Sequence, residues 1–431
     1  MRKIKKHIGL IIILMIILAF PTSLSNQTKI NMRVIVTGIA VDKSGDEYEV
    51  TAQIIKPSAG SKTAGSSATI DYIADKGKTI SGAISKMAFK AGKASAFSHT
   101  NFVILGKEML EEDVSVSLDY FIRDKIIKNS ALILFAEEKA GDEIKKTKST
   151  DMSVGIGLQK VFLFKEHESD GLMVTTMEFL NSNRGLSKTA TASVLSLKSE
   201  EESSGSKQSG SSGSGGSGES SGGSGGESGA SGGSSGGESS GGSSSGGSGQ
   251  NQNQYFVAET PVMLFVDGRF KGKLETHEEI SGYMITKKDS KAIDIMVESS
   301  DKNRLKDAKI EINIKNMGTS KKFKYKQDVP CLDITVKIYN AEINEIICDD
   351  IVSSLDEEEY QTMKKDLENE ISKRVKACFE KSKELKADIF EAYEMAYRKH
   401  YKKTKNHYNS MEEFLEKLEL NVNVDIRKLD Y

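Results

Sequence analysis

One stretch near the middle of the chain is built almost entirely from two residue types. Between Ser203 and Gln250, 41 of 48 residues are Gly or Ser, which leaves almost no apolar side chains for a core. Such a composition cannot offset the entropy lost on ordering, so we predict a disordered linker over residues 199–254. A flexible chain of this length has an end-to-end reach of roughly 40 Å. We therefore predict that the chain has two parts and that the linker decouples one part from the other.

The sequence on either side of the linker is long enough for separate cores. Residues 30–198 are expected to form an N-terminal α+β domain, with a further division near residue 140 left open. Residues 255–431 are expected to form a C-terminal α+β domain, in which strands precede a long helix. The predicted fold class is α+β and multidomain, with mixed sheets and packed helices.

The first 25 residues have the pattern of an export signal. Four basic residues within 1–7 precede an unbroken apolar run, Ile8–Phe20. Thirteen helical residues span about 20 Å, which is short of the roughly 30 Å hydrocarbon core of a bilayer. Small residues at Ser23 and Ser25 suit a cleavage site. Two interpretations stay open, a cleaved signal peptide or a retained N-terminal anchor, and both place the rest of the chain outside the cytoplasm.

Alternation of apolar and polar residues predicts strands and helices in the N-terminal part. A hairpin is expected from Val34–Val41 and Tyr48–Ile54, followed by a loop at Pro57–Ser67. The helices expected next are Thr79–Ala91, Val114–Arg123 and a short one from Met177 to Leu180, with helical spacing also between Val154 and Phe162. The further strands expected are Asn101–Leu105, Ala131–Ala136 and an extended end at Val194–Leu197.

The C-terminal part begins with strands and then changes to helices. Ser354 and Glu357 fit an S-x-x-E capping box, followed by a long helix with one apolar stripe from Tyr360 to Cys378. This stripe is expected to pack on the neighbouring sheet, and Asp388 is expected to cap a second helix that ends near His400. The strands expected are Tyr255–Phe265, Arg269–Leu274, Ile310–Ile314, Lys322–Lys326, Leu332–Tyr339, Ile343–Ile347 and Asn421–Arg427.

The charge balance and the motif content argue against several classes of protein. The chain has 60 basic and 62 acidic residues, which excludes a strongly basic nucleic-acid binder. It contains no P-loop, dinucleotide fingerprint or HExxH sequence, and the GxSxG match at Gly222–Gly226 is a chance product of the Gly/Ser composition. We therefore expect no enzyme, no cofactor, and no catalytic or metal-binding residues.

The histidines and cysteines give no clear site. His99 is expected to make a structural hydrogen bond, and His400 and His407 to lie at the solvated surface. The three thiols are read as buried or inert, with a Cys331–Cys348 bridge left open as the alternative. The basic run Arg398–Lys403 is a solvated helix end or, alternatively, a contact for anionic lipid or wall polymer.

Six short segments follow one another over nearly the whole non-linker chain. The segments are Val36–Asp42 (V-x-G-I-x-x-D), Gln53–Pro57 (Q-I-x-x-P), Gly77–Ile80 (G-x-T), His99–Glu108 (H-x-x-x-V-I-x-G-x-E), Asp119–Asp124 (D-F-x-x-R-D) and Leu385–Phe390 (L-K-A-D-I-F). In their order and spacing they resemble the Ger(x)C-type family of C subunits of spore germination nutrient receptors.

The resemblance implies a non-catalytic accessory subunit outside the inner membrane of a spore. Such a subunit is expected to be membrane-associated and to act with a membrane-embedded A subunit and a transporter-like B subunit in nutrient-triggered germination. It transfers no catalytic residues to this chain, and the matched positions are expected to serve the fold and docking. The nutrient is not indicated.

The sequence departs from the family pattern in two respects. The family's lipobox cysteine and following Trp have no counterpart, since the first cysteine is Cys331 and the chain has no Trp. Membrane retention is then expected from the leader or from partner subunits. The second departure is the linker, which makes a rigid relay between the two parts doubtful unless they pack directly. The alternative functions are an exported wall-facing binding module and an exported enzyme, both unrelated to germination.

Overall fold

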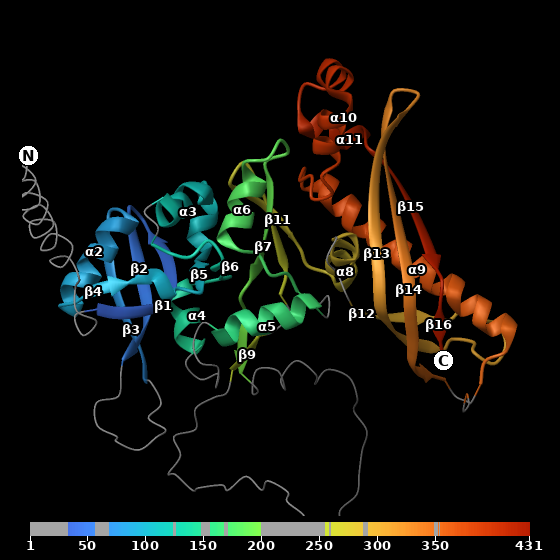
Figure 1. Cartoon of the computed structure of the whole chain (residues 1–431), viewed down its shortest axis with the longest axis horizontal. Helices are drawn as coiled ribbons and strands as arrows, with labels where there is room; N and C mark the ends of the chain where they lie inside the picture. Colours follow the sequence, from blue (N-terminus) through green and yellow to red (C-terminus); the bar gives the residue numbers. More distant parts are fainter. Residues whose placement is uncertain are drawn as a thin grey trace, which may run out of the picture.

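The computed structural model describes most of the chain apart from the leader and the linker. The described residues are 33–56, 69–123, 126–147, 156–167, 171–199, 255–257, 260–287, 292–348, 352 and 354–431. The predicted leader, the loop at 57–67, Val154 and residues 200–254 of the predicted linker lie outside them. Two large sheets and a two-stranded ribbon, with helices packed on them, make up the described part (Figure 1). The α+β class with mixed sheets is confirmed.

The first sheet has the strand order β11-β10-β7-β6-β5-β1-β2-β3, with β4 beside β1. β1 and β2 form the predicted hairpin around Gly45, whose φ of 60° suits a residue without a side chain. β5 and β6 run parallel to β1, so helices connect these strands. The strand bounds are β1 Arg33–Ser44, β2 Glu47–Lys56, β3 Thr69–Gly77, β4 Ala94–Ala96, β5 Phe102–Leu105, β6 Leu132–Phe135, β7 Thr189–Val194, β10 Val262–Val266 and β11 Arg269–Leu274.

The helices of this part largely follow the apolar periodicity of the sequence. The predicted helices at 79–91 and 114–123 are confirmed as α2 and α3, and the Thr79 side chain accepts the Gly82 N–H at the start of α2. Phe121 of α3 is buried, and Ile122 is half-buried and packs against the same core. α4 was not predicted, because it has only seven residues. The helix bounds are α2 Ile80–Ala91, α3 Val114–Arg123, α4 Ala140–Lys146, α5 Ile156–His167 and α6 Thr176–Asn183, with 3₁₀ turns η2 Phe97–His99 and η3 Lys107–Glu111.

The two ends of the predicted linker are held together. β8 (Leu197–Ser199) and β9 (Tyr255–Val257) pair antiparallel, with Ser199 opposite Tyr255. Paired strands lie about 5 Å apart, so the ends of the segment are separated by far less than its free reach. The expectation that the linker decouples the two parts is therefore wrong, because the segment is inserted between two paired strands.

The first sheet also crosses the predicted boundary at residue 255. β10 pairs antiparallel with β7, and β11 pairs with β10 at the edge of the same sheet. The apolar strand β10 thus has β11 along one edge and β7, from the chain before the linker, along the other. The chain after the linker thus completes the sheet of the chain before it, which joins the two parts directly. The domain bounds themselves stay a prediction.

The second sheet is built around one long hairpin. β13 and β14 each contain two of the predicted strands, because β-bulges let the ladder continue past residues 311–317. Gln327 and Asp328, with φ of 47° and 71°, form the two-residue turn between them. The described strands follow the order β12-β13-β14-β15, with β16 beside β14. The bounds are β12 Ile293–Glu298, β13 Lys309–Lys326, β14 Val329–Ile347, β15 Glu419–Ile426 and β16 Leu429–Asp430.

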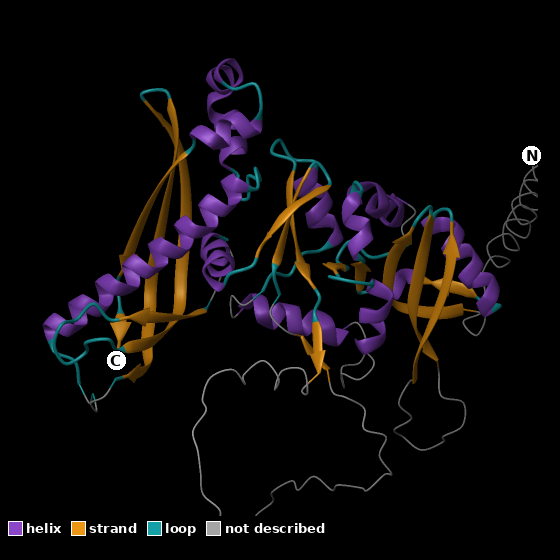
Figure 2. Ribbon diagram, turned by 180° about the vertical axis from the view of Figure 1, so that it is seen from behind, coloured by secondary structure: helices purple, strands orange, loops and turns teal. Residues whose placement is uncertain are grey.

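The long helix α9 lies across one face of the second sheet, as its apolar stripe predicts (Figure 2). It also packs on α8, which was not predicted. Gly282 of α8 lies against the backbone carbonyl of Arg374, and a side chain at Gly282 would overlap this carbonyl. The close crossing of the two helices therefore depends on a glycine. The bounds are α8 His277–Thr286, α9 Glu357–Glu384, α10 Ala392–His407 and α11 Met411–Lys417.

The start of α9 differs from the prediction by two residues. Asp356, not Ser354, caps the helix, and its side chain accepts the Glu359 N–H at 2.8 Å while Glu359 accepts the Asp356 N–H at 2.9 Å. The S-x-x-E match at Ser354 is wrong because an equally good D-x-x-E match follows it. Glu359 also binds Arg304, which fixes this helix end to the loop before β13.

Both sheets contribute to one continuous core. The larger cluster of buried apolar residues extends from Val36 and Val103 in the first sheet to Ile312 and Val336 in the second. A smaller cluster, which includes Phe162 of α5, covers the other face of the first sheet. The continuous core thus shows that the two parts pack as neighbours.

No helix in the described ranges is long and apolar enough to cross a membrane.

Candidate functional site

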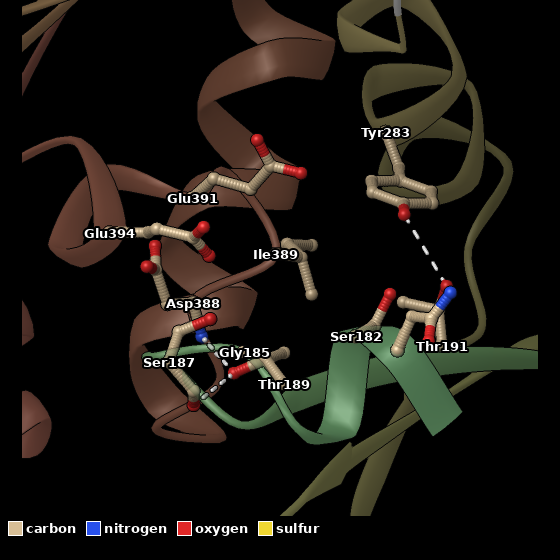
Figure 3. A pocket seen from close by; sticks show the side chains of 11 residues that line it. Ser182, Gly185, Ser187, Thr189, Thr191, Tyr283, Asp388, Ile389, Glu391 and Glu394 are labelled. Atoms are coloured by element: carbon tan, nitrogen blue, oxygen red, sulfur yellow. Dashed lines mark hydrogen bonds between the residues drawn. The ribbon is translucent and has the colours of Figure 1, made fainter. Parts of the chain in front are cut away.

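A cleft lies where the first sheet meets the helices of the second part. Two adjoining hollows of about 280 and 330 Å³ share Ser182, Thr191, Tyr283 and Glu391. α6 and β7 form one wall of the cleft, and α8 with the segment between α9 and α10 forms the other (Figure 3). We call these two hollows the junction cleft. It is the place where residues from both parts of the chain surround one space.

Asp388, from the predicted L-K-A-D-I-F segment, holds this wall together. Its carboxylate accepts the backbone N–H groups of Ala392 at 2.8 Å and Tyr393 at 2.9 Å at the start of α10. Its own N–H donates to Thr189 Oγ1 of β7 at 3.2 Å. The predicted capping role of Asp388 is confirmed, although α10 continues past His400 to His407. One residue therefore caps a helix and binds the opposite wall.

The electrostatics of the junction cleft follow from burial. Burial away from water raises the pKa of Asp388 to about 6, although the two N–H donors stabilise the carboxylate and act to lower this pKa. Burial also raises the pKa of Tyr283. It lowers the pKa of Lys321, although the negative charges of Glu391 and Asp388 partly offset this lowering. Burial thus raises the pKa of the Asp388 carboxyl and lowers the pKa of the Lys321 ammonium group near it.

The rim of the cleft combines hydroxyl groups with carboxylates. Tyr283 OH lies 3.4 Å from Thr191 Oγ1, a long hydrogen bond across the junction (Figure 3). Lys287 Nζ forms an ion pair with Glu166 at 2.9 Å. The described lining contains neither His nor Cys. The arrangement suits hydrogen bonding to a polar group.

A second predicted segment does similar work in the first sheet. The carboxylate of Asp42, in V-x-G-I-x-x-D, accepts the N–H groups of Ala140 at 2.7 Å and Gly141 at 2.8 Å at the start of α4. A side chain at Gly106 would overlap the Asp42 carboxylate, and one at Gly38 would overlap the ring of Phe102. These glycines are therefore needed for close approach. Burial raises the pKa of Asp42 despite the two N–H donors.

The remaining matched segments also form structural contacts. Gln53 is fully buried and donates to Thr147 Oγ1 at 2.8 Å and to Tyr72 OH at 3.3 Å. Asp119 of α3 forms an ion pair with Arg184 at 3.0 Å, which ties α3 to the end of α6. These residues hold elements together and do not line the junction cleft.

The histidines are spread over the molecule. His277 Nε2 lies 3.3 Å from Arg374 Nη1 between α8 and α9, and His407 Nδ1 lies 2.9 Å from the Lys403 carbonyl. His99 is exposed in η2, and His400 lies at a kink in α10. The basic run Arg398–Lys403 lies on α10, mostly exposed to solvent. Within the described ranges no group of His, Cys, Asp or Glu side chains has the arrangement of a metal site.

The open alternative of a Cys331–Cys348 bridge is wrong. Cys331, Cys348 and Cys378, all within the described ranges, form no disulfide bond. Cys331 lies near the start of β14 and Cys348 just beyond its end, so the extended strand separates them by about 55 Å. Cys378 is buried in α9, and burial raises the pKa of its thiol far above the usual range. Cys331 and Cys378 are thus buried in the core, and Cys348 is half-buried.

Two family models match the chain one after the other. The model described as the spore germination protein N-terminal domain matches residues 26–197, and the model described as spore germination B3/GerAC-like, C-terminal, matches residues 260–428. The chain belongs to the GerAC family of spore germination proteins. The two models leave out the Gly/Ser-rich segment and together include both walls of the junction cleft.

Individual GerAC relatives are distant. Spore germination protein B3 of Bacillus subtilis (strain 168) is 27% identical over 111 residues, which are 25% of this chain and 29% of that protein. YfkR of the same organism is 29% identical over 144 residues, which are 32% of this chain and 38% of YfkR. The chain thus matches less than two fifths of either relative's length. The crystal structure of the GerBC protein aligns with 91% of this chain and 96% of that chain, at 14% identity and a TM-score of 0.49.

The sequence did not predict the junction cleft. Its lining comes from α6, β7, α8 and the segment 388–394, which lie far apart in the sequence and are brought together in a fold where β10 pairs with β7. Asp388 was predicted as a cap, but its contact with Thr189 was not. The one local signal for the missed wall was Thr276 and Glu279, which form a capping box at the start of α8.

Proposed function

We propose that this protein is a non-catalytic accessory subunit, of the C type, of a spore germinant receptor. The observation that carries the proposal is the match of both GerAC family models, in order, to residues 26–197 and 260–428. In this role the protein acts with the A and B membrane subunits in nutrient-triggered germination.

The location that we propose is the outer face of the spore inner membrane. The basic residues at the start of the chain and the apolar run Ile8–Phe20 support export across that membrane. Retention there comes from the leader or from the A and B subunits.

The connection between the two parts supports an accessory role in which a partner bound at one sheet affects the position of the other sheet. β7–β10 pairing and the Asp388 contact with Thr189 join the two parts through main-chain and side-chain hydrogen bonds. A subunit joined in this way is suited to hold two receptor partners in a fixed relation.

The experiment that tests the function is dipicolinate release from spores that lack the gene, over a panel of amino acids, sugars and nucleosides. We expect loss of the response to one nutrient class and its return with the wild-type gene. Unchanged release for every nutrient, also after the paralogous receptor genes are deleted together, would contradict the proposal. It would favour the alternative of an exported protein that acts on or binds the cell wall.

A further inference from the structure

The outer face of α2 carries an apolar side chain in an unusual setting. Phe89 is 91% exposed, more than any other large apolar side chain in the described part of the chain. Lys86 and Lys90 lie on the same helix face, one turn before Phe89 and directly after it, and Lys93 follows the Gly92 cap. All three lysines are exposed. A strongly exposed aromatic ring thus lies beside two lysines of the same helix, with a third lysine just beyond the end of the helix.

This face lies beside the point where the chain enters the fold. Arg33, the first described residue, pairs with Ala94, which directly follows Lys93. α2 lies at the outer end of the molecule, away from the second sheet (Figure 1). The 32 residues before Arg33 include the apolar run Ile8–Phe20. A membrane that receives this run therefore lies within a short length of chain from α2.

We propose that the α2 face formed by Lys86, Phe89, Lys90 and Lys93 rests on an anionic lipid surface. The Phe89 ring enters the interface between headgroups and acyl chains, and the ammonium groups lie among the anionic headgroups. The inference rests on the proposed function only for the presence of a membrane. It adds the surface that meets the membrane and the class of lipid.

The composition of the face favours lipid over a protein partner. The centres of protein interfaces are depleted in lysine, whereas membrane-binding helices combine lysines with an exposed aromatic or aliphatic side chain. Asp75 is the acidic residue on the shallow groove beside Phe89, and its carboxylate accepts the Lys76 N–H at 2.8 Å. Lys90 Nζ donates to the Ala74 carbonyl at 3.2 Å, which leaves Lys86 and Lys93 as the variants of choice.

The chain allows a direct test, because it contains no Trp. Phe89→Trp in the full chain introduces a single tryptophan, and Phe164→Trp, at a side chain 66% exposed on α5, is the matched control. We expect a blue shift, and quenching by brominated acyl chains, for Phe89→Trp on vesicles of phosphatidylcholine and phosphatidylglycerol but not on phosphatidylcholine alone. Phe164→Trp is expected to show neither. Equal spectra for the two variants, or no response of Phe89→Trp, would overturn the proposal.

A second measurement separates the contribution of the lysine charges to vesicle binding from that of the leader. The leader is kept in every variant. Each lysine near an anionic surface raises affinity about fivefold, so Lys86→Ala with Lys93→Ala is expected to weaken vesicle binding about 25-fold. Lys302→Ala with Lys306→Ala removes the same charge from an exposed loop of the second part and is expected to change little. Equal losses for both pairs would overturn the proposal. Because vesicles contain no receptor subunits, this result is independent of the spore experiment.

Discussion

Asp42 and Asp388 perform the same local task in two different surroundings. Each is a buried aspartate whose two carboxylate oxygens accept successive backbone N–H groups at a helix start, α4 for Asp42 and α10 for Asp388. Asp42 binds a helix of its own sheet. Asp388 also donates its N–H to Thr189 of the other part of the chain. The same carboxylate cap thus stabilises one unit at Asp42, whereas at Asp388 it stabilises a segment whose main chain also contacts the other unit.

The difference teaches how two family segments can share a chemistry and differ in consequence. Loss of the Asp42 cap is expected to loosen α4 within the first sheet. Loss of the Asp388 cap is expected to loosen the wall of the junction cleft and the contact between the two parts. The predictions below change one aspartate site at a time, so that the other serves as the reference.

The largest effect is expected from Gly106→Ala. The added methyl group would overlap the Asp42 carboxylate, which is held by two N–H donors and cannot move away without losing them. Overpacking together with the lost hydrogen bonds is expected to lower the free energy of unfolding by about 4 kcal/mol. Gly318→Ala is the control, since its nearest neighbour is the partly exposed ring of Tyr339 at 3.3 Å. Urea unfolding measures both, and equal midpoints would contradict the argument.

Helices and strands that have one apolar face were predictable from the sequence. α3 and the hairpin β1–β2 have clear periods and were predicted close to their bounds. α8 was missed because it is buried on all sides from Ile280 to Thr286, so it has no apolar stripe. β12 was missed although Ile293, Ile295 and Val297 alternate in the sequence. The junction cleft depends on pairing between distant strands, for which a single sequence carries no signal.

The next effect is a dependence of stability on pH that comes from Asp388. Its pKa is about 6 in the folded protein and 3.8 in the reference state, so the folded protein keeps this proton to higher pH. The contribution of Asp388 to stability is therefore present below about pH 4 and is lost as pH rises to about 6, by at most about 3 kcal/mol. Asp388→Asn does not titrate, so its unfolding free energy is expected to lack this fall.

Asp42 provides the comparison for this pH dependence. Burial also raises the pKa of Asp42, so this residue too makes the unfolding free energy decrease as pH rises. Asp42→Asn is expected to remove that decrease. Thermal or urea unfolding at pH 4, 5, 6 and 7 gives the difference between the wild type and each variant. A difference that does not change with pH for Asp388→Asn would contradict the raised pKa.

A smaller effect is expected when either cap is removed. Asp388→Ala and Asp42→Ala each leave two helix N–H groups without their acceptor, which costs about 2 kcal/mol. The location of the loosening distinguishes them. Hydrogen exchange is expected to rise in α10 and β7 for Asp388→Ala, and in α4 alone for Asp42→Ala. Faster exchange in β7 with both variants would remove the distinction between a local cap and a joint.

The smallest effect sharpens the comparison at the junction cleft itself. Tyr283 OH lies 3.4 Å from Thr191 Oγ1 across the junction, whereas Tyr325 OH lies 3.0 Å from Thr404 Oγ1 within the second part. Phe keeps the packed ring in both places and removes only the hydroxyl group. We expect Tyr283→Phe to cost about 0.5 kcal/mol and Tyr325→Phe about 1 kcal/mol, because the longer bond is weaker. Double-mutant cycles with Thr191→Val and Thr404→Val measure the two couplings. A larger coupling at Tyr283 would mean that the hydroxyl bond, and not the strand pairing and Asp388, holds the two parts together.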